Sequence, residues 1–196
     1  MYFSKRFGRL LVIGMLLGLV ACSSNKPPST VVDACRIKGE RPHWYKSMVK
    51  TEKKWGVPVS VQMATIARES SFQHDARPTK RVGSWIFARD VPRSSALGFS
   101  QALDGTWDMY KQQTGRRSAD RTDFADSSDF IGWYMSHNAK INGVARNDAF
   151  NQYLAYHEGF SGYARGTWRG KSWLPVVATD VQRWANRYES QLAGCS

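Results

Sequence analysis

One glutamate, Glu69, ends the most apolar segment of the chain and is the first candidate for acid–base chemistry. Residues 58–67 place apolar side chains around most of a predicted helix, a pattern typical of a helix buried in a core. A carboxyl at the end of such a helix loses solvation, and the negative end of the helix dipole disfavours its ionised form. Both effects raise the pKa of Glu69, as a general acid working near neutral pH requires. The alternative is an exposed glutamate just past the helix, paired with Arg68 or Arg77.

The segments that would position Glu69 are predicted to be helical. Apolar and aromatic side chains recur three or four residues apart over most of the chain, and no segment shows convincing strand alternation. Asp123, Asp126 and Asp129 are expected to cap the start of a helix, because acidic residues complement the helix dipole there. The predicted fold class is therefore mainly α, with helices over or near residues 42–55, 58–70, 107–113, 123–135, 148–156 and 177–192.

Residues 72–97 lack a sustained periodicity and are predicted to form a long loop or lid. They contain two prolines and five basic residues. The basic side chains are expected either to steer acidic groups of a substrate or to be solvated; they are Arg77, Lys80, Arg81, Arg89 and Arg93.

The N-terminal segment is predicted to be an export signal. Three basic residues precede a short apolar run over residues 10–20, which is too short to span a membrane. Residues 19–22, LVAC, resemble the lipobox of bacterial lipoproteins, in which the cysteine is acylated and becomes the first mature residue. This resemblance implies a lipid anchor on Cys22, and Ser23 after it favours the outer membrane, facing the periplasm.

The predicted organisation is a signal peptide over residues 1–21, a lipidated cysteine and polar tether over 22–40, and one folded domain over 41–196. The chain has a formal net charge of +12, and removal of the signal, which holds three basic and no acidic residues, leaves +9. In an exported protein such a charge indicates an anionic cell envelope, and nucleic acid is not an expected partner.

The three cysteines fit an oxidising compartment. If Cys22 is acylated, Cys35 and Cys195 remain as an even pair. A disulfide between them would tie together the two ends of the folded domain, with two free thiols as the alternative. The four scattered histidines and the lack of an HExxH sequence argue against a zinc site, and neither a metal nor another cofactor is expected.

Three short segments resemble motifs of the lytic transglycosylase family with the soluble lytic transglycosylase (SLT) domain. Residues 58–71 contain the Glu-Ser pair in which that family carries its catalytic glutamate. Residues 98–101, GFSQ, resemble the family's Gly-Leu-Met-Gln, and residues 155–159, AYHEG, resemble its Ala-Tyr-Asn-Ala-Gly. Each motif alone is weak, but three in the right order on a helical chain behind a lipobox make a specific combination.

The resemblance implies an α-helical, lysozyme-like domain of the goose type that cleaves peptidoglycan between N-acetylmuramic acid and N-acetylglucosamine. Glu69 would protonate the glycosidic oxygen and then act as base while the muramic C6 hydroxyl attacks C1 and forms a 1,6-anhydro ring. One carboxyl then suffices, unlike the usual glycosidase pair. Gln101 would contact the glycan, and Tyr156 would hydrogen-bond and orient Glu69. Ser70 would either belong to the site or cap the helix end.

The second and third motifs depart from the family pattern. Phe99 and Ser100 replace Leu and Met, which alters an apolar contact with the acetyl group of the sugar, and His157 replaces Asn. Glu158 opens an alternative in which a second carboxylate activates water and makes a hydrolytic muramidase, and Asp75 is another candidate for that role. A third hypothesis is a peptidoglycan-binding lipoprotein that has kept the fold and lost turnover.

Three tryptophans in irregular segments are candidates for stacking on sugar faces, with a core or filler role as the alternative; they are Trp85, Trp168 and Trp173. The expected partners are therefore the glycan strands of peptidoglycan and, through Cys22, a membrane. The sequence indicates no particular protein partner.

Overall fold

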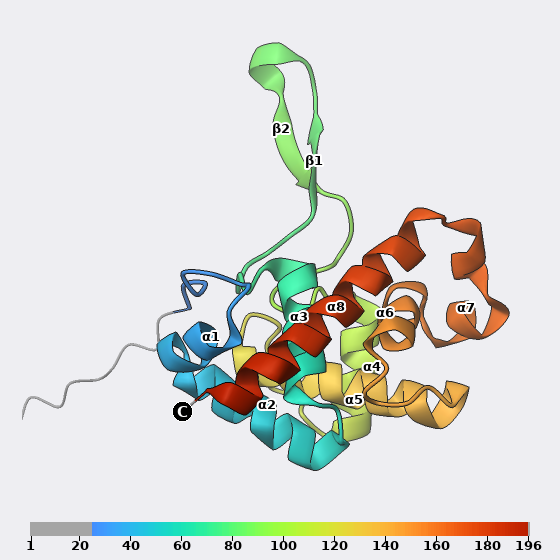
Figure 1. Cartoon of the computed structure of the whole chain (residues 1–196). Helices are drawn as coiled ribbons and strands as arrows, with labels where there is room; N and C mark the ends of the chain where they lie inside the picture. Colours follow the sequence, from blue (N-terminus) through green and yellow to red (C-terminus); the bar gives the residue numbers. More distant parts are fainter. Residues whose placement is uncertain (1–24, 196) are drawn as a thin grey trace, which may run out of the picture.

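The computed structural model describes residues 25–195, so the predicted signal peptide over 1–21 and the predicted acylation site Cys22 lie outside the described residues. Within residues 25–195 the chain forms eight α-helices, two short 3-10 helices and one two-stranded antiparallel sheet (Figure 1). The prediction of a mainly α fold is confirmed. In this part of the chain, none of the helices combines the length and the apolar character needed to cross a membrane.

Helix α3 lies among the other helices and packs mainly against α8, while α2 packs against α5 and α6 against α8 (Figure 1). The last helix begins a few residues earlier than the sequence indicates. In chain order the α-helices are α1 (Ala34–Glu40), α2 (Pro42–Trp55), α3 (Val59–Ser70), α4 (Asp104–Thr114), α5 (Phe124–Asn142), α6 (Ala149–Glu158), α7 (Phe160–Arg165) and α8 (Trp173–Gly194), with the 3-10 helix η2 (Thr167–Gly170) before α8.

The burial of α3 agrees with its apolar sequence. Ten of its twelve residues are buried, including the polar Gln62. The Gln62 amide donates to the carbonyl of Val57 at 2.8 Å, and its oxygen accepts from the Ser128 hydroxyl at 2.9 Å. Because this buried amide has partners on both its nitrogen and its oxygen, it links α3 to its surroundings without an unpaired polar group. The helix that carries Glu69 in its last turn is therefore buried over most of its length.

Helix α1 is part of the folded body, although the sequence analysis assigns residues 22–40 to a tether. Asp33 caps the start of α1 by accepting a hydrogen bond from the Arg36 N–H at 3.0 Å. Ile37 is fully buried, and α1 packs against α2 and α8. The difference arises because a helix of seven residues is too short to show a clear apolar period.

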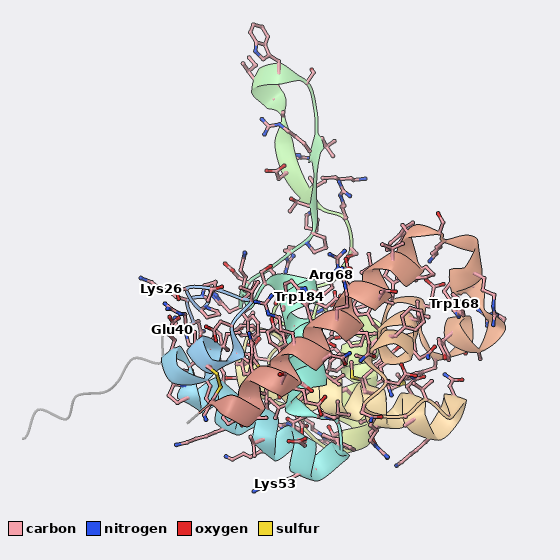
Figure 2. All side chains as sticks on the ribbon, viewed as in Figure 1. Lys26, Glu40, Lys53, Arg68, Trp168 and Trp184 are labelled. Carbon is pink, nitrogen blue, oxygen red and sulfur yellow. A yellow bond between two sulfur atoms is a disulfide. The ribbon has the colours of Figure 1, made fainter. Side chains whose placement is uncertain are left out.

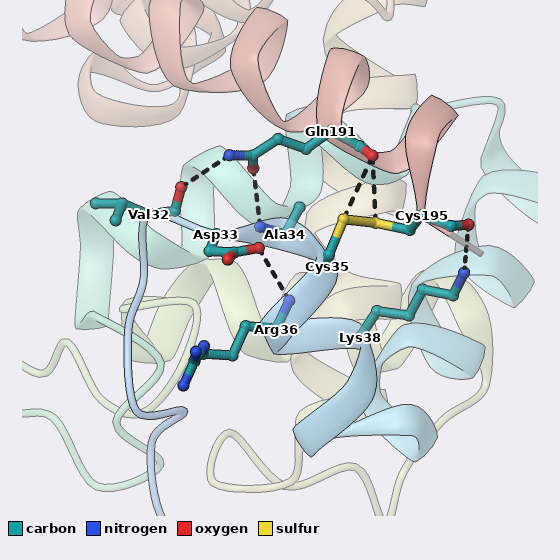
Figure 3. Close-up of a disulfide and its surroundings, with 8 residues drawn as sticks. All are labelled: Val32, Asp33, Ala34, Cys35, Arg36, Lys38, Gln191 and Cys195. Carbon is teal, nitrogen blue, oxygen red and sulfur yellow. Dashed lines mark hydrogen bonds between the residues drawn. A yellow bond between two sulfur atoms is a disulfide. The ribbon is translucent and has the colours of Figure 1, made fainter.

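A disulfide fixes α1 to the end of α8 (Figures 2 and 3). Cys35 in α1 is bonded to Cys195, and the two Cα atoms lie 5.5 Å apart. The side-chain oxygen of Gln191 in α8 accepts a hydrogen bond from the Ala34 N–H at 2.9 Å beside it. The pairing that the sequence suggested for these two cysteines is thus present, and it closes a loop with a sequence separation of 160.

The three aspartates expected to cap a helix start have different environments. Asp123 is the N-cap of α5 and accepts a hydrogen bond from the Asp126 N–H at 2.9 Å, which confirms its capping role. Asp129 lies further along α5 and is buried, so the capping prediction is wrong for this residue. The donors around its carboxylate are the Lys54 ammonium at 3.0 Å, the Trp55 indole N–H at 2.9 Å, the Tyr110 hydroxyl at 2.7 Å and the Arg116 guanidinium at 3.2 Å.

Residues 72–97 contain a β-hairpin, so the expectation of a loop or lid without strands is wrong. Strand β1 (Thr79–Val82) pairs antiparallel with β2 (Arg89–Pro92), and the 3-10 helix η1 (Trp85–Phe87) lies between them. The hairpin extends away from the helical body (Figure 1). The strands escaped prediction because residues on both of their faces are exposed, which removes the alternation that marks a half-buried strand.

Candidate active site

Glu69 lies in the last turn of α3, where the chain turns abruptly. Ser71 and Phe72 both have positive φ angles, 51° and 62°, a conformation that a bulky residue such as Phe rarely adopts. The Phe72 ring is fully buried and stacks with the ring of Trp44 at 6.1 Å and that of Phe124 at 6.3 Å. This aromatic packing holds the strained turn in place and so fixes the path of the backbone after Glu69.

The Glu69 carboxyl is poorly solvated although its side chain keeps partial exposure. Loss of solvation raises the pKa of Glu69 from 4.5 to about 7, and this effect outweighs the Tyr153 hydroxyl and the charge of Arg68, which both lower it. The prediction of a raised pKa is therefore confirmed. Near neutral pH Glu69 is present both as acid and as carboxylate, as a group that donates a proton and later accepts one requires.

Two tyrosines of α6 lie near Glu69, and they share a helix face because they are three residues apart. The Tyr153 hydroxyl lies near the Glu69 carboxyl and lowers its pKa, and it also interacts with Arg68. Tyr156, which was expected to hydrogen-bond Glu69, donates its hydroxyl to the backbone carbonyl of Ser100 at 2.5 Å. Burial, followed by the charge of Glu69, raises the pKa of Tyr156 and keeps this donor protonated. The hydrogen bond predicted from Tyr156 to Glu69 is thus corrected, and Tyr153, which sequence analysis missed, is the tyrosine that lowers the pKa of Glu69.

Residues 98–101 form a tight turn that is fixed by a close backbone approach and by the side-chain amide of Gln101. Gly98 has a φ of 75°, and a Cβ there would lie 2.0 Å from the carbonyl oxygen of Arg121, so only glycine fits. Gln101, with a φ of 50°, donates its side-chain amide to the carbonyls of Ala76 at 2.7 Å and Gly98 at 2.8 Å. The amide nitrogen of Gln101 therefore clamps this turn to the segment that leads into the hairpin.

Phe99 and Ser100 lie in the core, which corrects their assignment to the sugar site, and Ser70 takes the structural role at the helix end that was one of its two expected roles. The Phe99 ring is fully buried and meets the Trp44 ring edge-on at 5.2 Å. Ser100 is also buried, with its hydroxyl 3.4 Å from that of Ser127. Ser70 donates its hydroxyl to a carbonyl one turn earlier in α3, at 3.1 Å. Motif spacing predicts that such residues lie near the site, but it does not indicate which of them reach solvent.

Glu158 is bound by three neighbours at the end of α6. Its carboxylate lies 2.6 Å from the Lys171 ammonium and 2.9 Å from His157 Nδ1, and it accepts a hydrogen bond from the Thr167 hydroxyl. Burial of the carboxylate raises its pKa, but these hydrogen bonds outweigh burial and lower the pKa of Glu158 to about 2. A carboxylate held in this way is a weak base and ties α6 to the segment before α8. His157 completes the group through an edge contact with the Trp173 ring at 5.1 Å.

The remaining candidates have other neighbours. Asp75 is exposed, and its carboxylate lies 3.7 Å from Nδ1 of His74. Trp168 packs against the core, while Trp173 at the start of α8 is about half exposed. Trp85 lies at the far end of the hairpin, away from the helices. The residues that the structure gathers around Glu69 are therefore the two tyrosines of α6 and Arg68.

Comparison with known protein families matches residues 10–195 to the transglycosylase SLT domain. The chain therefore belongs to the transglycosylase SLT domain family, which confirms the resemblance carried by the three motifs. No curated protein matches the chain. Together with the helical fold, this membership defines a lysozyme-like domain of the peptidoglycan lytic transglycosylase class.

Proposed function

We propose that Glu69 is the single general acid and base of a lytic transglycosylase that cleaves the β-1,4 bond between N-acetylmuramic acid and N-acetylglucosamine. The observation that carries this proposal is the poorly solvated carboxyl at the end of α3, whose pKa is raised to about 7. The two rival carboxylates are less suited. Glu158 is occupied by an ammonium and two further donors, and Asp75 is exposed beside His74.

In the proposed reaction the Glu69 carboxyl takes part in two proton transfers. Protonated Glu69 first gives its proton to the glycosidic oxygen, and the bond from that oxygen to C1 of the muramic residue breaks. The resulting carboxylate then takes the proton of the C6 hydroxyl while the C6 oxygen bonds to C1. A 1,6-anhydro ring closes and Glu69 returns to its acid form. The substrate supplies the nucleophile, so the second carboxylate of ordinary glycosidases is not required.

The reaction products test the proposal directly. Digestion of purified sacculi should release muropeptides that are one water lighter than hydrolysed ones, as mass spectrometry would show. Products with hydrated reducing ends would instead identify a muramidase and overturn the anhydro mechanism. Binding to sacculi with no products at all would favour a wall-binding protein that has lost turnover.

Tyr153 is proposed to tune the proton affinity of Glu69. The Tyr153 hydroxyl lowers the pKa of Glu69, so Tyr153→Phe should raise that pKa further. Because the first step needs protonated Glu69, activity falls as pH rises through this pKa, and the variant's alkaline limb should lie at higher pH. Tyr163→Phe is the matched control, since the Tyr163 hydroxyl binds Asn151 at 2.9 Å. A pH profile of kcat/KM for Tyr153→Phe that coincides with that of the control would contradict this role.

We also propose that the protein is exported and lipid-anchored through Cys22, with the outer membrane, facing the periplasm, as its location. The support is the lipobox-like sequence LVAC at residues 19–22 and the Ser23 that follows it. Metabolic labelling with a fatty acid should label the full chain but not the Cys22→Ser variant, and fractionation should place the labelled protein with outer membranes. Equal labelling of both chains, or of neither, would contradict the anchor.

A further inference from the structure

The hairpin of residues 79–92 has no role in the proposed reaction, yet its shape is well defined. Its strands pair in the register Thr79 with Pro92 through Val82 with Arg89. Neither face of this two-stranded sheet is covered by the helical body (Figure 1). An isolated two-stranded sheet is marginally stable in water, so a surface that covers part of it would stabilise it.

The tip of the hairpin presents three consecutive large apolar residues to solvent. Trp85 is 91% exposed, Ile86 74% and Phe87 79%. Single exposed apolar residues are common on proteins, but three adjacent ones at the end of a projection make a patch that marks an interaction site.

The conformation of this tip is specified by local contacts. Gly83 has a φ of 98°, and a Cβ there would lie 2.6 Å from the carbonyl oxygen of Phe87, so glycine is required for the turn. The Phe87 N–H donates to the backbone carbonyl of Ser84 at 3.0 Å, and the Ala88 N–H donates to that of Trp85 at 3.2 Å. These two bonds close one turn of 3-10 helix. Trp85 itself has a φ of 45°. The sequence thus builds a turn that holds the apolar side chains outward.

The stem of the hairpin is strongly basic. Residues 77–93 contain five arginine or lysine residues and one acidic residue, Asp90. Three of the basic residues lie in the strands themselves, next to the apolar tip, and all three are exposed; they are Lys80, Arg81 and Arg89. An apolar end with cationic groups directly behind it matches the layered chemistry of an anionic bilayer, whose phosphate groups lie just outside its hydrocarbon.

We propose that the hairpin tip, residues 83–88, inserts into the surface of a bilayer that contains anionic phospholipid. Trp85 suits the interfacial layer because it combines an apolar ring with an N–H donor, and Ile86 and Phe87 enter the hydrocarbon edge. Arg81 and Arg89 contact lipid phosphates. A glycan strand offers no apolar phase for an aliphatic side chain such as Ile86, which favours the bilayer over the substrate as the occupant. This proposal does not depend on Glu69, on its reaction or on acylation of Cys22.

A dye placed at the tip tests this proposal in the full chain. We would introduce Ile86→Cys into a Cys22→Ser chain, keep the Cys35–Cys195 disulfide closed, and attach an environment-sensitive fluorophore to the new thiol. The chain would be reconstituted with vesicles of phosphatidylglycerol and phosphatidylethanolamine. We expect a blue-shifted emission and quenching by nitroxide groups on the lipid tails. The same dye at Ile141→Cys, an exposed position on α5, is the matched control and should not respond.

Charge reversal and a change of vesicle composition test whether insertion of the tip depends on the attraction between the basic stem and anionic lipid. Arg81→Glu with Arg89→Glu in the labelled chain should lower the fraction of inserted tip at least about tenfold, and so should replacement of phosphatidylglycerol by phosphatidylcholine. Far-UV circular dichroism would verify that each labelled chain is folded. An emission at residue 86 that stays unchanged with anionic vesicles would overturn the proposal. A response to soluble glycan fragments or to an added protein without vesicles would overturn it as well.

Discussion

Glu69→Gln should reduce the rate of peptidoglycan cleavage by about 10²-fold to 10⁴-fold, the range expected when a general acid is lost. Glutamine keeps the size of the side chain but can neither donate a proton to the glycosidic oxygen nor accept one from the C6 hydroxyl. Release of anhydro-muropeptides from purified sacculi measures the effect, while sedimentation with sacculi measures binding, which should persist. Because one group is proposed to serve both proton transfers, rescue by another carboxylate is not expected.

The matched control for this substitution is Glu189→Gln, which makes the same chemical change at an exposed glutamate of α8. It should retain full activity. If Glu69→Gln kept more than a tenth of the activity of the wild type, Glu69 would not be the general acid, and Glu158→Gln would be the next variant to measure.

The raised pKa of Glu69 also makes a prediction about stability. Its pKa is about 7 in the folded protein, against 4.5 ordinarily, so the folded state binds the proton more tightly than the unfolded state. The stability that this proton confers is complete below about pH 4.5 and is lost as the pH rises to about 7. Glu69→Gln removes this loss, so it should unfold at a higher denaturant concentration than the wild type above pH 7 and lose that advantage in acid.

Asp129→Ala should lower the free energy of unfolding by about 3 kcal/mol, the largest stability effect expected from a single polar residue here. The carboxylate binds Trp55 and Tyr110 and also pairs with Lys54 and Arg116. Its removal leaves the partly buried indole N–H of Trp55 and the buried hydroxyl of Tyr110 without an acceptor. Helices α2, α4 and α5 also lose the group that links them. Urea denaturation at neutral pH measures the change.

The pH dependence of this effect has a definite sign. Burial raises the pKa of Asp129, but hydrogen bonds from Trp55, Tyr110 and Lys54 outweigh burial and bring it below its ordinary value of 3.8. The stability from Asp129 is therefore present above about pH 3.8 and is lost as the pH falls through the lowered pKa. Asp108→Ala removes an exposed ion pair with Lys111 and should change the stability by less than about 1 kcal/mol. An equally small effect of Asp129→Ala would show that the cluster does not anchor the helices.

The sequence indicated the poor solvation of Glu69 well because the physical signal is local. An apolar helix with a glutamate in its last turn predicts a poorly solvated carboxyl at Glu69, and the structure has one. Tyr153 was missed because its partner lies far away in sequence. The available signal was its position one turn before Tyr156, which places both hydroxyls on the same face of α6.

Other features depend on how deeply a side chain is buried and on its tertiary contacts. The spacing of residues along the sequence encodes neither. Phe99 was assigned to the sugar site by its place in a motif, but its ring packs against the rings of Trp44 and Phe124. Asp129 has the same spacing as its two capping neighbours and differs only because α2 and α4 cover it. The hairpin strands have no buried face and therefore no alternating pattern.

The bond between Cys35 and Cys195 also determines how the domain carries a mechanical load. A pull on the chain ahead of α1 passes through this bond directly into α8, which packs along α3. The force is therefore shared between the short helix α1 and the C-terminal end of α8, and it cannot peel the N-terminal helices away one after another. Between the two cysteines the chain is a closed covalent ring that such a pull cannot lengthen. A domain tethered at that end would thus keep α3, which carries Glu69, folded under a tension that unravels an uncrosslinked chain.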